Sequence, residues 1–252
     1  PNPIVDVMNQ LGYDAATPGN HDFNFGVATL KESLRRASFQ VVSANIVGQP
    51  SGESMFLRQA VLVRGGVRVG VTGFTTPGVM VWDRNNVRGQ AQVQRIGATA
   101  PAELRRLRQS LDFVIALIHS GMDGGSSYDS AGVGPENVAA SLAAGAVRPD
   151  LVVVGHSHRD MRDSVLNGVH FIQGKPYAQT LAVAHVSLAR DGAGWRVTAI
   201  RGDQIDLAGL EPPPGRFRRV AEAQDEVRLW AATPIAAATA LERAVARLRE
   251  RG

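Results

Sequence analysis

Apolar residues are spaced at helical intervals in some segments of the chain and in strand-like runs in others. The helical intervals predict helices over 3–11, about 26–37, about 100–110 and near 135–145. The β-rich runs predict strands over 13–17, 39–44, 56–64, 67–75, 113–118 and 151–154. Gly65-Gly66 separates two of these runs and predicts a two-residue hairpin turn. Residues 76–97 show little periodicity and predict a long excursion.

The pattern changes after about residue 164. Runs at 164–173, 180–189 and 195–205 predict antiparallel strands, with a turn at Asp191-Gly192. Pro212-Pro213-Pro214 then interrupts the chain, and 216–248 predicts two helices separated at Thr233-Pro234. Strand–helix alternation followed by a β meander predicts an α/β (α+β) fold with helices outside the sheets.

Composition restricts the class of protein. The 252 residues are 44% hydrophobic and 20% charged, which is ordinary for a globular domain with a substantial core. No run of about 18 apolar residues predicts a membrane span, and no signal peptide opens the chain. The absence of cysteine excludes thiolate metal sites, disulfides and cysteine nucleophiles. The net charge of +4 comes from scattered arginines, so it favours a small anionic substrate over a nucleic-acid polymer.

Four of the six histidines lie in loops that follow apolar strands. His21 is part of Gly19-Asn20-His21-Asp22, and His119 follows the strand at 113–118. His156 and His158 belong to Gly155-His156-Ser157-His158, directly after the strand at 151–154. Because α/β sheets place ligands and reacting groups at the carboxyl ends of their strands, these loops predict one common site.

The pair at 156 and 158 favours metal binding. In an extended loop, residues two apart point the same way, so both imidazoles are expected to face one pocket. Imidazole nitrogen suits divalent transition metals, and the glycines before Asn20 and His156 allow close backbone approach. A single histidine after a strand is more often a satisfied polar residue, but three such loops together favour a site. His170 and His185, inside β runs, are interpreted as structural.

The ordered set of these three motifs resembles the calcineurin-like metallophosphoesterase superfamily. Further segments are similar to its bacterial group of 5′-nucleotidases and 2′,3′-cyclic-nucleotide 2′-phosphodiesterases/3′-nucleotidases. These segments are 11–14, 18–26, Ser43-Ala44-Asn45-Ile46, Pro135-Glu136-Asn137-Val138 and Gly174-Lys175-Pro176. Asn24 favours the cyclic-phosphodiesterase branch, because the strict 5′-nucleotidases that this chain resembles usually carry Asp there.

The resemblance implies a four-layer α-β-β-α sandwich that binds two divalent metal ions, drawn from Mn, Zn, Fe, Co or Mg, with a bridging hydroxide. It also assigns roles to residues of this chain. Asn20, His119 and His156 match the ligands of one ion, and His158 matches a ligand of the other. His21 matches the histidine that stabilises the transition state or assists the leaving oxygen, and Asp22 has a supporting role. The substrate implied is a small nucleotide, and the implied location is the periplasm or the cell surface.

The family pattern also contains an Asp-x-His motif and a Gly-Asp motif near its start. Asp-x-His does not occur here, and the only Gly-Asp is Gly202-Asp203, interpreted as a turn. We therefore expect 1–210 to be a metallophosphoesterase domain truncated at its N-terminus, nearly inactive in isolation. Residues 211–252 are expected to be a helical linker toward a nucleotide-binding domain absent from this chain. The alternatives are a catalytically dead homologue with a binding or structural role, and a related two-metal sulfur-ester hydrolase.

Overall fold

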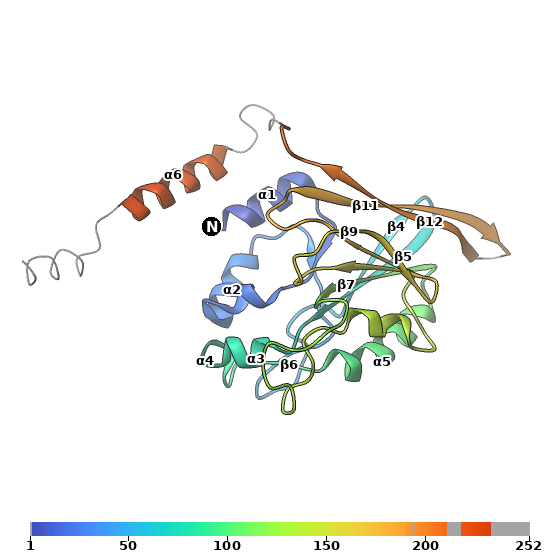
Figure 1. Ribbon diagram of the computed structural model, residues 1–252, viewed down its shortest axis with the longest axis horizontal. Helices are drawn as coiled ribbons and strands as arrows, with labels where there is room; N and C mark the ends of the chain where they lie inside the picture. The colour runs from blue at the N-terminus through green and yellow to red at the C-terminus, as the bar shows by residue number, and fades with distance from the viewer. Residues whose placement is uncertain (1, 193, 211–217, 233–252) are drawn as a thin grey trace, which may run out of the picture.

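A mixed six-stranded sheet forms the centre of the protein in the computed structural model, which describes residues 2–192, 194–210 and 218–232 (Figure 1). The strand order is β4-β5-β7-β8-β10-β9. The strands are β4 (Gln59–Arg64), β5 (Val67–Thr75), β7 (Phe113–His119), β8 (Leu151–Val154), β10 (Val169–Gln173) and β9 (Met161–Leu166). The four inner strands run parallel, and each edge strand is antiparallel to its neighbour. The carboxyl ends of β5, β7 and β8 therefore meet at one edge of the sheet.

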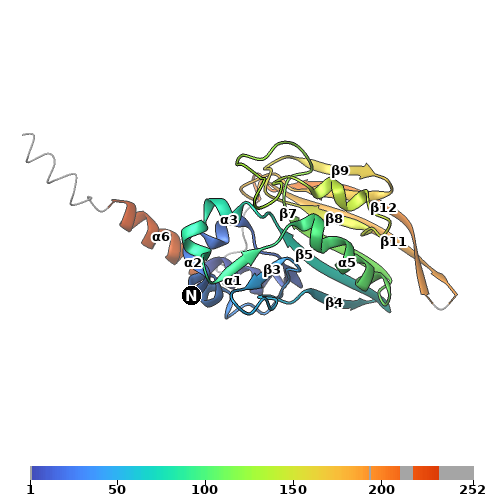
Figure 2. The same cartoon turned by 90° about the horizontal axis from the view of Figure 1, so that it is seen from below.

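Both faces of the sheet are covered, as expected for parallel strands with continuous apolar runs. On one face, α5 (Ile96–Arg108) and the short 3₁₀ helix η2 (Ala139–Ala143) contribute Ile96, Leu107 and Leu142 to a core with Val114 and Phe171. The hairpin of β11 (Thr180–Asp191) and β12 (Gly194–Asp206) packs on the opposite face. Figure 1 shows this hairpin above the sheet and α5 below it, and Figure 2 shows α5 lying along the strands. The layered α/β fold is thus confirmed.

The N-terminal segment is built from short elements. They are α1 (Pro3–Leu11), β1 (Ala15–Ala16), the 3₁₀ helix η1 (Asn20–Phe23), α2 (Gly26–Leu34) and β2 (Gln40–Val41). The side chain of Asn2 caps α1 by accepting the Ile4 amide at 3.0 Å, and Gly12 ends the helix with a φ of 73°. β1 and β2 pair in parallel over only two residues each. A cavity of about 300 Å³ lies between α1 and α2.

The segment 76–97 differs from the sequence-based expectation. It contains α3 (Val79–Trp82), α4 (Arg84–Val87) and β6 (Ala91–Val93), and β6 pairs antiparallel with β3 (Ile46–Gly48). Val79 and Val87 are buried against Phe23 and Leu30 of the N-terminal segment. The sequence predicted only a long excursion and none of these elements, because elements of three or four residues are too short to show a period.

Three further predictions need correction. The helix near 135–145 is only the 3₁₀ helix η2, and 164–173 is a hairpin of β9 and β10 rather than one strand. Gly202-Asp203 lies inside β12, not in a turn. There a Cβ on residue 202 would meet the Arg162 carbonyl oxygen at 2.1 Å, so glycine is required by close packing.

At the C-terminal end, α6 (Arg218–Ala232) matches the first of the two predicted terminal helices. The second, predicted beyond Thr233-Pro234, lies outside the described residues. Within the part of the chain that the structure describes, every helix is too short or too polar to cross a membrane.

Candidate metal centre

Three loops that are distant in sequence meet at the carboxyl edge of the sheet. His119 is the last residue of β7, and His156 follows β8, which pairs with β7 through Ile118 and Val154. Asn20 opens η1 and is buried, with 8% of its surface exposed. Its Oδ1 lies 2.7 Å from Nε2 of His119 and 3.3 Å from Nδ1 of His156. The structure thus brings together three of the four residues predicted as metal ligands.

The loop carrying Asn20 is fastened to the end of β5. The buried hydroxyl of Thr75 donates to the carbonyl of Pro18 at 2.7 Å. Asn45, fully buried, accepts the Thr75 amide at 2.9 Å and donates to its carbonyl at 2.7 Å. The segment Ser43-Ala44-Asn45-Ile46, noted above only for its resemblance, therefore helps to hold the Asn20 loop against the sheet.

Two glycines make room for the ring of His119. A Cβ on Gly19 would lie 2.7 Å from Cε1 of His119, and a Cβ on Gly155 would lie 3.2 Å from its Nδ1. The imidazole is therefore held closely between the backbones of two other loops. The expectation that the glycines before Asn20 and His156 permit close backbone approach is confirmed.

The three converging atoms fit a divalent metal ion. Ligands about 2.1 Å from one ion lie roughly 3 Å apart, close to the separations found here. Burial, together with the neighbouring ring of His156, lowers the pKa of His119 to about 3. His119 is therefore neutral at pH 7, the form in which imidazole binds metal. One amide oxygen and two imidazole nitrogens are a donor set suited to Zn, Mn, Fe or Co.

A buried carboxylate orients His156. Oε1 of Glu136 lies 2.8 Å from Nε2 of His156, and its Oε2 accepts the Ser127 amide at 2.6 Å. A carboxylate only accepts, so Nε2 carries the proton and the lone pair of Nδ1 points toward Asn20. Burial raises the pKa of Glu136, but the hydrogen bonds from Ser127 and His156 outweigh this effect and hold that pKa below its ordinary value.

Sequence reasoning did not identify Glu136, although it noted Pro135-Glu136-Asn137-Val138 for its resemblance. Trp82 also lies beside the cluster. The Trp82 ring centroid lies 5.7 Å from that of His156 and 5.3 Å from that of Tyr128, so these rings form one wall of the site. No local signal marks either residue, because Glu136 lies in the long segment between β7 and η2 and Trp82 ends the four-residue helix α3.

His158 does not follow His156 into the cluster. The two residues have φ values of 53° and 77°, so the loop is not extended and the alternation expected for neighbours two apart is wrong. His158 is exposed, and its ring centroid lies 6.0 Å from that of Tyr177. Across the described residues, no group of three or more His, Cys, Asp or Glu side chains is placed to hold a metal ion. The role of His158 as a ligand of a second ion stays a prediction.

The two residues predicted to take part in catalysis lie beside the cluster. His21 is exposed, and its Nδ1 lies 2.8 Å from Oδ1 of Asn24. Oδ2 of Asp22 accepts the amide of Gly19 at 2.7 Å. Asp22 thus stabilises the turn that presents Asn20, which is consistent with a supporting role.

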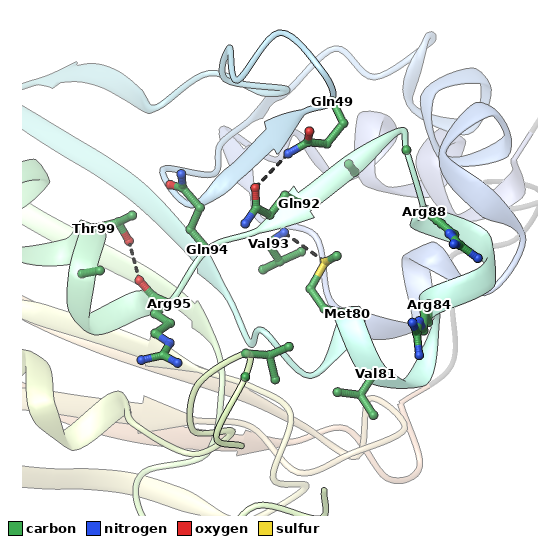
Figure 3. Close-up of a pocket in the computed structure, with 15 residues that line it drawn as sticks. Gln49, Met80, Val81, Arg84, Arg88, Gln92, Val93, Gln94, Arg95 and Thr99 are labelled. Atoms are coloured by element: carbon green, nitrogen blue, oxygen red, sulfur yellow. Dashed lines mark hydrogen bonds between the residues drawn. The ribbon is translucent and has the colours of Figure 1, made fainter. Parts of the chain in front are cut away.

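The α3–α4 segment also borders a separate groove of about 1060 Å³ (Figure 3). Arg84, Arg88 and Arg95 line it. The Val93 amide donates to Sδ of Met80 at 3.3 Å, a contact marked by a dashed line in Figure 3. None of the six predicted site residues lines this groove. The candidate metal centre is therefore a different place from this large basic groove.

The sheet, the covering helices and the His–Asn cluster define a metallophosphoesterase domain. Residues 3–160 match the family model described as calcineurin-like phosphoesterase, so the chain belongs to that family. This family uses divalent metal ions and hydrolyses phosphate esters.

Particular relatives narrow the comparison. The chain is 30% identical over 231 residues to the trifunctional nucleotide phosphoesterase protein YfkN of Bacillus subtilis, covering 82% of this chain and 16% of the relative. It is 28% identical to a 2′,3′-cyclic-nucleotide 2′-phosphodiesterase/3′-nucleotidase of Haemophilus influenzae, covering 79% of this chain and 33% of that protein. The crystal structure of Bacillus subtilis YfkN superposes with a TM-score of 0.78 at 27% identity, covering 91% of this chain and 74% of that one. The chain thus spans a third or less of these two curated relatives.

Proposed function

We propose that this chain carries part of the catalytic centre of a metal-dependent hydrolase of nucleotide phosphate esters. The type favoured is the 2′,3′-cyclic-nucleotide 2′-phosphodiesterase/3′-nucleotidase or the 5′-nucleotidase. The observation that carries the proposal is the convergence of Asn20, His119 and His156, whose ligand atoms lie within 3.3 Å of Asn20 Oδ1. Two relatives with nucleotide phosphoesterase names support the substrate class.

Each residue of the centre has a separate role in this proposal. Asn20, His119 and His156 would hold one divalent ion, and His158 would contribute to a second. When bound, the ions polarise the phosphate and activate the attacking water. Trp82 and Tyr128 shield one side of the cluster, and His21 assists the departing oxygen, a contribution of about 10²–10⁴-fold when it is proton transfer.

We further propose that the centre is completed by residues outside these 252. The three converging ligands include no carboxylate, and Glu136 is engaged with His156 rather than aimed at the cluster centre. A second ion needs ligands besides His158. In this proposal, 1–210 form the main part of the phosphoesterase domain and 211–252 link it to a nucleotide-binding domain. Export to the periplasm or cell surface, implied by the resemblance, belongs to the same proposal and is checked by cell fractionation.

The test uses the full-length protein that contains this chain, supplied with Mn²⁺ or Co²⁺. Hydrolysis is measured on 2′,3′-cyclic AMP, 3′-AMP, 5′-AMP and bis-p-nitrophenyl phosphate, with His119→Gln as the inactive reference. We expect turnover of at least one nucleotide that is abolished by EDTA and by His119→Gln. A protein that binds metal but hydrolyses none of these esters would instead be a binding or structural homologue, and the proposal would fail.

A further inference from the structure

A buried carboxylate is linked through Asn24 to His21, the predicted catalytic histidine. Asp83 connects α3 and α4 and has only 4% of its surface exposed. It makes no ion pair with any described side chain, and its Oδ2 has no hydrogen-bond partner within the described part of the chain. Burying a carboxylate with an unpaired oxygen costs folding free energy, so the presence of Asp83 at this position calls for an explanation.

The other oxygen of Asp83 receives two amide groups. Oδ1 accepts Nδ2 of Asn24 at 2.9 Å and Nδ2 of Asn86 at 3.1 Å. Nδ2 of Asn86 also donates to the backbone carbonyl of Asn24 at 2.9 Å. Asn24 is therefore held at both its backbone and its side chain.

These contacts determine which way the Asn24 amide points. A carboxylate accepts and cannot donate, so Nδ2 of Asn24 must face Asp83. Its Oδ1 must then face the other way, where it lies 2.8 Å from Nδ1 of His21. An amide oxygen also only accepts, so Nδ1 of His21 must carry a proton. The carboxylate thereby sets the tautomer of a histidine that it does not touch.

We propose that Asp83 is a positioning residue for His21, acting through Asn24. It fixes the neutral ring in the tautomer with the proton on Nδ1, and it leaves Nε2 as the nitrogen available to substrate. Nε2 of His21 has no hydrogen-bond partner among the described residues. This inference rests on the proposed function, because it assigns His21 to the leaving oxygen of a phosphate ester.

The fixed tautomer matches the chemistry of leaving-group departure. Nε2 of the neutral ring first takes up a proton from water to give the imidazolium. As the bond between phosphorus and the ester oxygen breaks, its electron pair goes to that oxygen, and the proton on Nε2 follows it. The ring that remains is neutral and keeps its proton on Nδ1, the arrangement that Asn24 accepts. The transition state is thus stabilised without rearrangement of the surrounding hydrogen bonds.

Replacing the carboxylate by an amide removes the constraint. In Asp83→Asn, residue 83 can donate or accept, so the Asn24 amide can turn and present Nδ2 to His21. The tautomer with the proton on Nε2 then becomes accessible, and its Nδ1 accepts from Asn24. A change of this kind in the orienting acid of a catalytic triad lowers kcat about 10⁴-fold. We expect kcat to fall about 10- to 100-fold here, because an amide lies between the carboxylate and the histidine.

The first experiment compares leaving groups in the full-length protein with Mn²⁺. For Asp83→Asn, kcat on 3′-AMP should fall about 10- to 100-fold with KM within about threefold, the scale of one misplaced acid. On p-nitrophenyl phosphate, whose leaving group departs without a proton, kcat should change less than about threefold. The double variant Asn24→Asp/Asp83→Asn restores an acceptor beside Nδ1 of His21 and should recover most of the 3′-AMP rate.

Asp112→Asn is the matched control. Asp112 accepts the Arg68 amide at 2.7 Å just before β7 begins, at the end of that strand opposite His119. Both rates should stay at their wild-type values in this variant. Equal losses on both substrates in Asp83→Asn, or no recovery in the double variant, would reduce Asp83 to a packing residue and overturn the inference.

The second experiment observes the tautomer directly. Long-range ¹H–¹⁵N spectra of the metal-free, ¹⁵N-labelled protein are recorded at a pH where the imidazoles are neutral, with His21→Gln identifying the signal. Wild type should show Nδ1 protonated, and Asp83→Asn should show the Nε2 form appearing. The same tautomer in both would overturn the inference. A wild-type protein with the expected tautomer but no esterase activity would leave the positioning intact and refute the proposed function instead.

Discussion

The six-stranded sheet and the segment 3–41 both supply residues to the candidate metal centre, but they are built differently. His119 ends a strand of seven residues paired along its length with β5, and His156 follows the neighbouring strand. Asn20 and His21 instead follow β1, which pairs with β2 over two residues only. Within the same segment, Ile4, Leu11 and Phe25 expose 61%, 56% and 82% of their surface.

The difference shows that the centre has a rigid half and a weakly supported half. Parallel strands covered on both faces open only when the domain unfolds, whereas short elements with few buried contacts open locally. An ion held by Asn20, His119 and His156 would join the two halves. Part of its binding free energy would then stabilise the N-terminal segment.

Removing a ligand from the rigid half should have the largest effect. His156→Ala leaves two of the three converging atoms, so metal affinity and turnover of the full-length protein should each fall by more than about 100-fold, beyond the loss typical of an outer residue. Metal content and esterase rate check this. His185→Ala, which changes an exposed histidine of β11, is the control. Retention of metal by His156→Ala would show that this half does not bind it.

Glu136→Gln should have the next largest effect. The variant keeps the shape of the side chain but can present an amide group to Nε2 of His156, so the orientation of the ring is no longer enforced. We expect the dissociation constant for Mn²⁺ to rise about 10- to 100-fold by titration calorimetry. Glu32→Gln, which alters only an exposed pair with Arg35 on α2, should bind as wild type. Equal affinities in the two variants would contradict a role for Glu136.

Hydrogen exchange should separate the two halves directly. In metal-free protein, amides of α1, η1 and α2 should exchange at least about tenfold faster than those of β5 and β7, which open only with the whole domain. Adding Mn²⁺ should slow exchange in η1 and leave β5 unchanged. Uniform protection across both regions would show that the N-terminal segment is as stable as the sheet.

The smallest effect concerns acid stability. The pKa of His119 in the folded protein is about 3, below its ordinary 6.5, so only the unfolded chain takes up this proton between these values. The contribution is absent above pH 6.5, and stability falls as the pH drops toward 3. Metal-free protein should lose about 1 kcal/mol of unfolding free energy between pH 7.5 and 5.5 from this group. Urea titrations at the two pH values measure the unfolding free energy, and the loss should be larger by that amount in wild type than in His119→Asn. Equal losses in the two proteins would show that the burial of His119 is unimportant for acid stability.

Much of this centre could be predicted from the sequence because its ligands follow strands that the apolar pattern reveals. The runs at 113–118 and 151–154 predict two buried strands, and the histidines one and two residues beyond their ends must lie at one edge of a parallel sheet. The short elements within 76–97 could not be predicted in the same way, because helices of four residues leave no period to detect. For that reason Trp82 and Asp83 were not recognised.

The sequence by itself determined the class of fold, the three loops and the residue types that could bind metal. Only the tertiary structure decided which side chains support them. Glu136 reaches His156 across 20 residues, and Asp83 reaches Asn24 across 59. The left-handed backbone at His156 and His158 likewise turns one ring into the cluster and the other toward Tyr177. Periodicity reports the local path of the chain, whereas these partners are set by long-range packing and by single φ angles that no repeating pattern encodes.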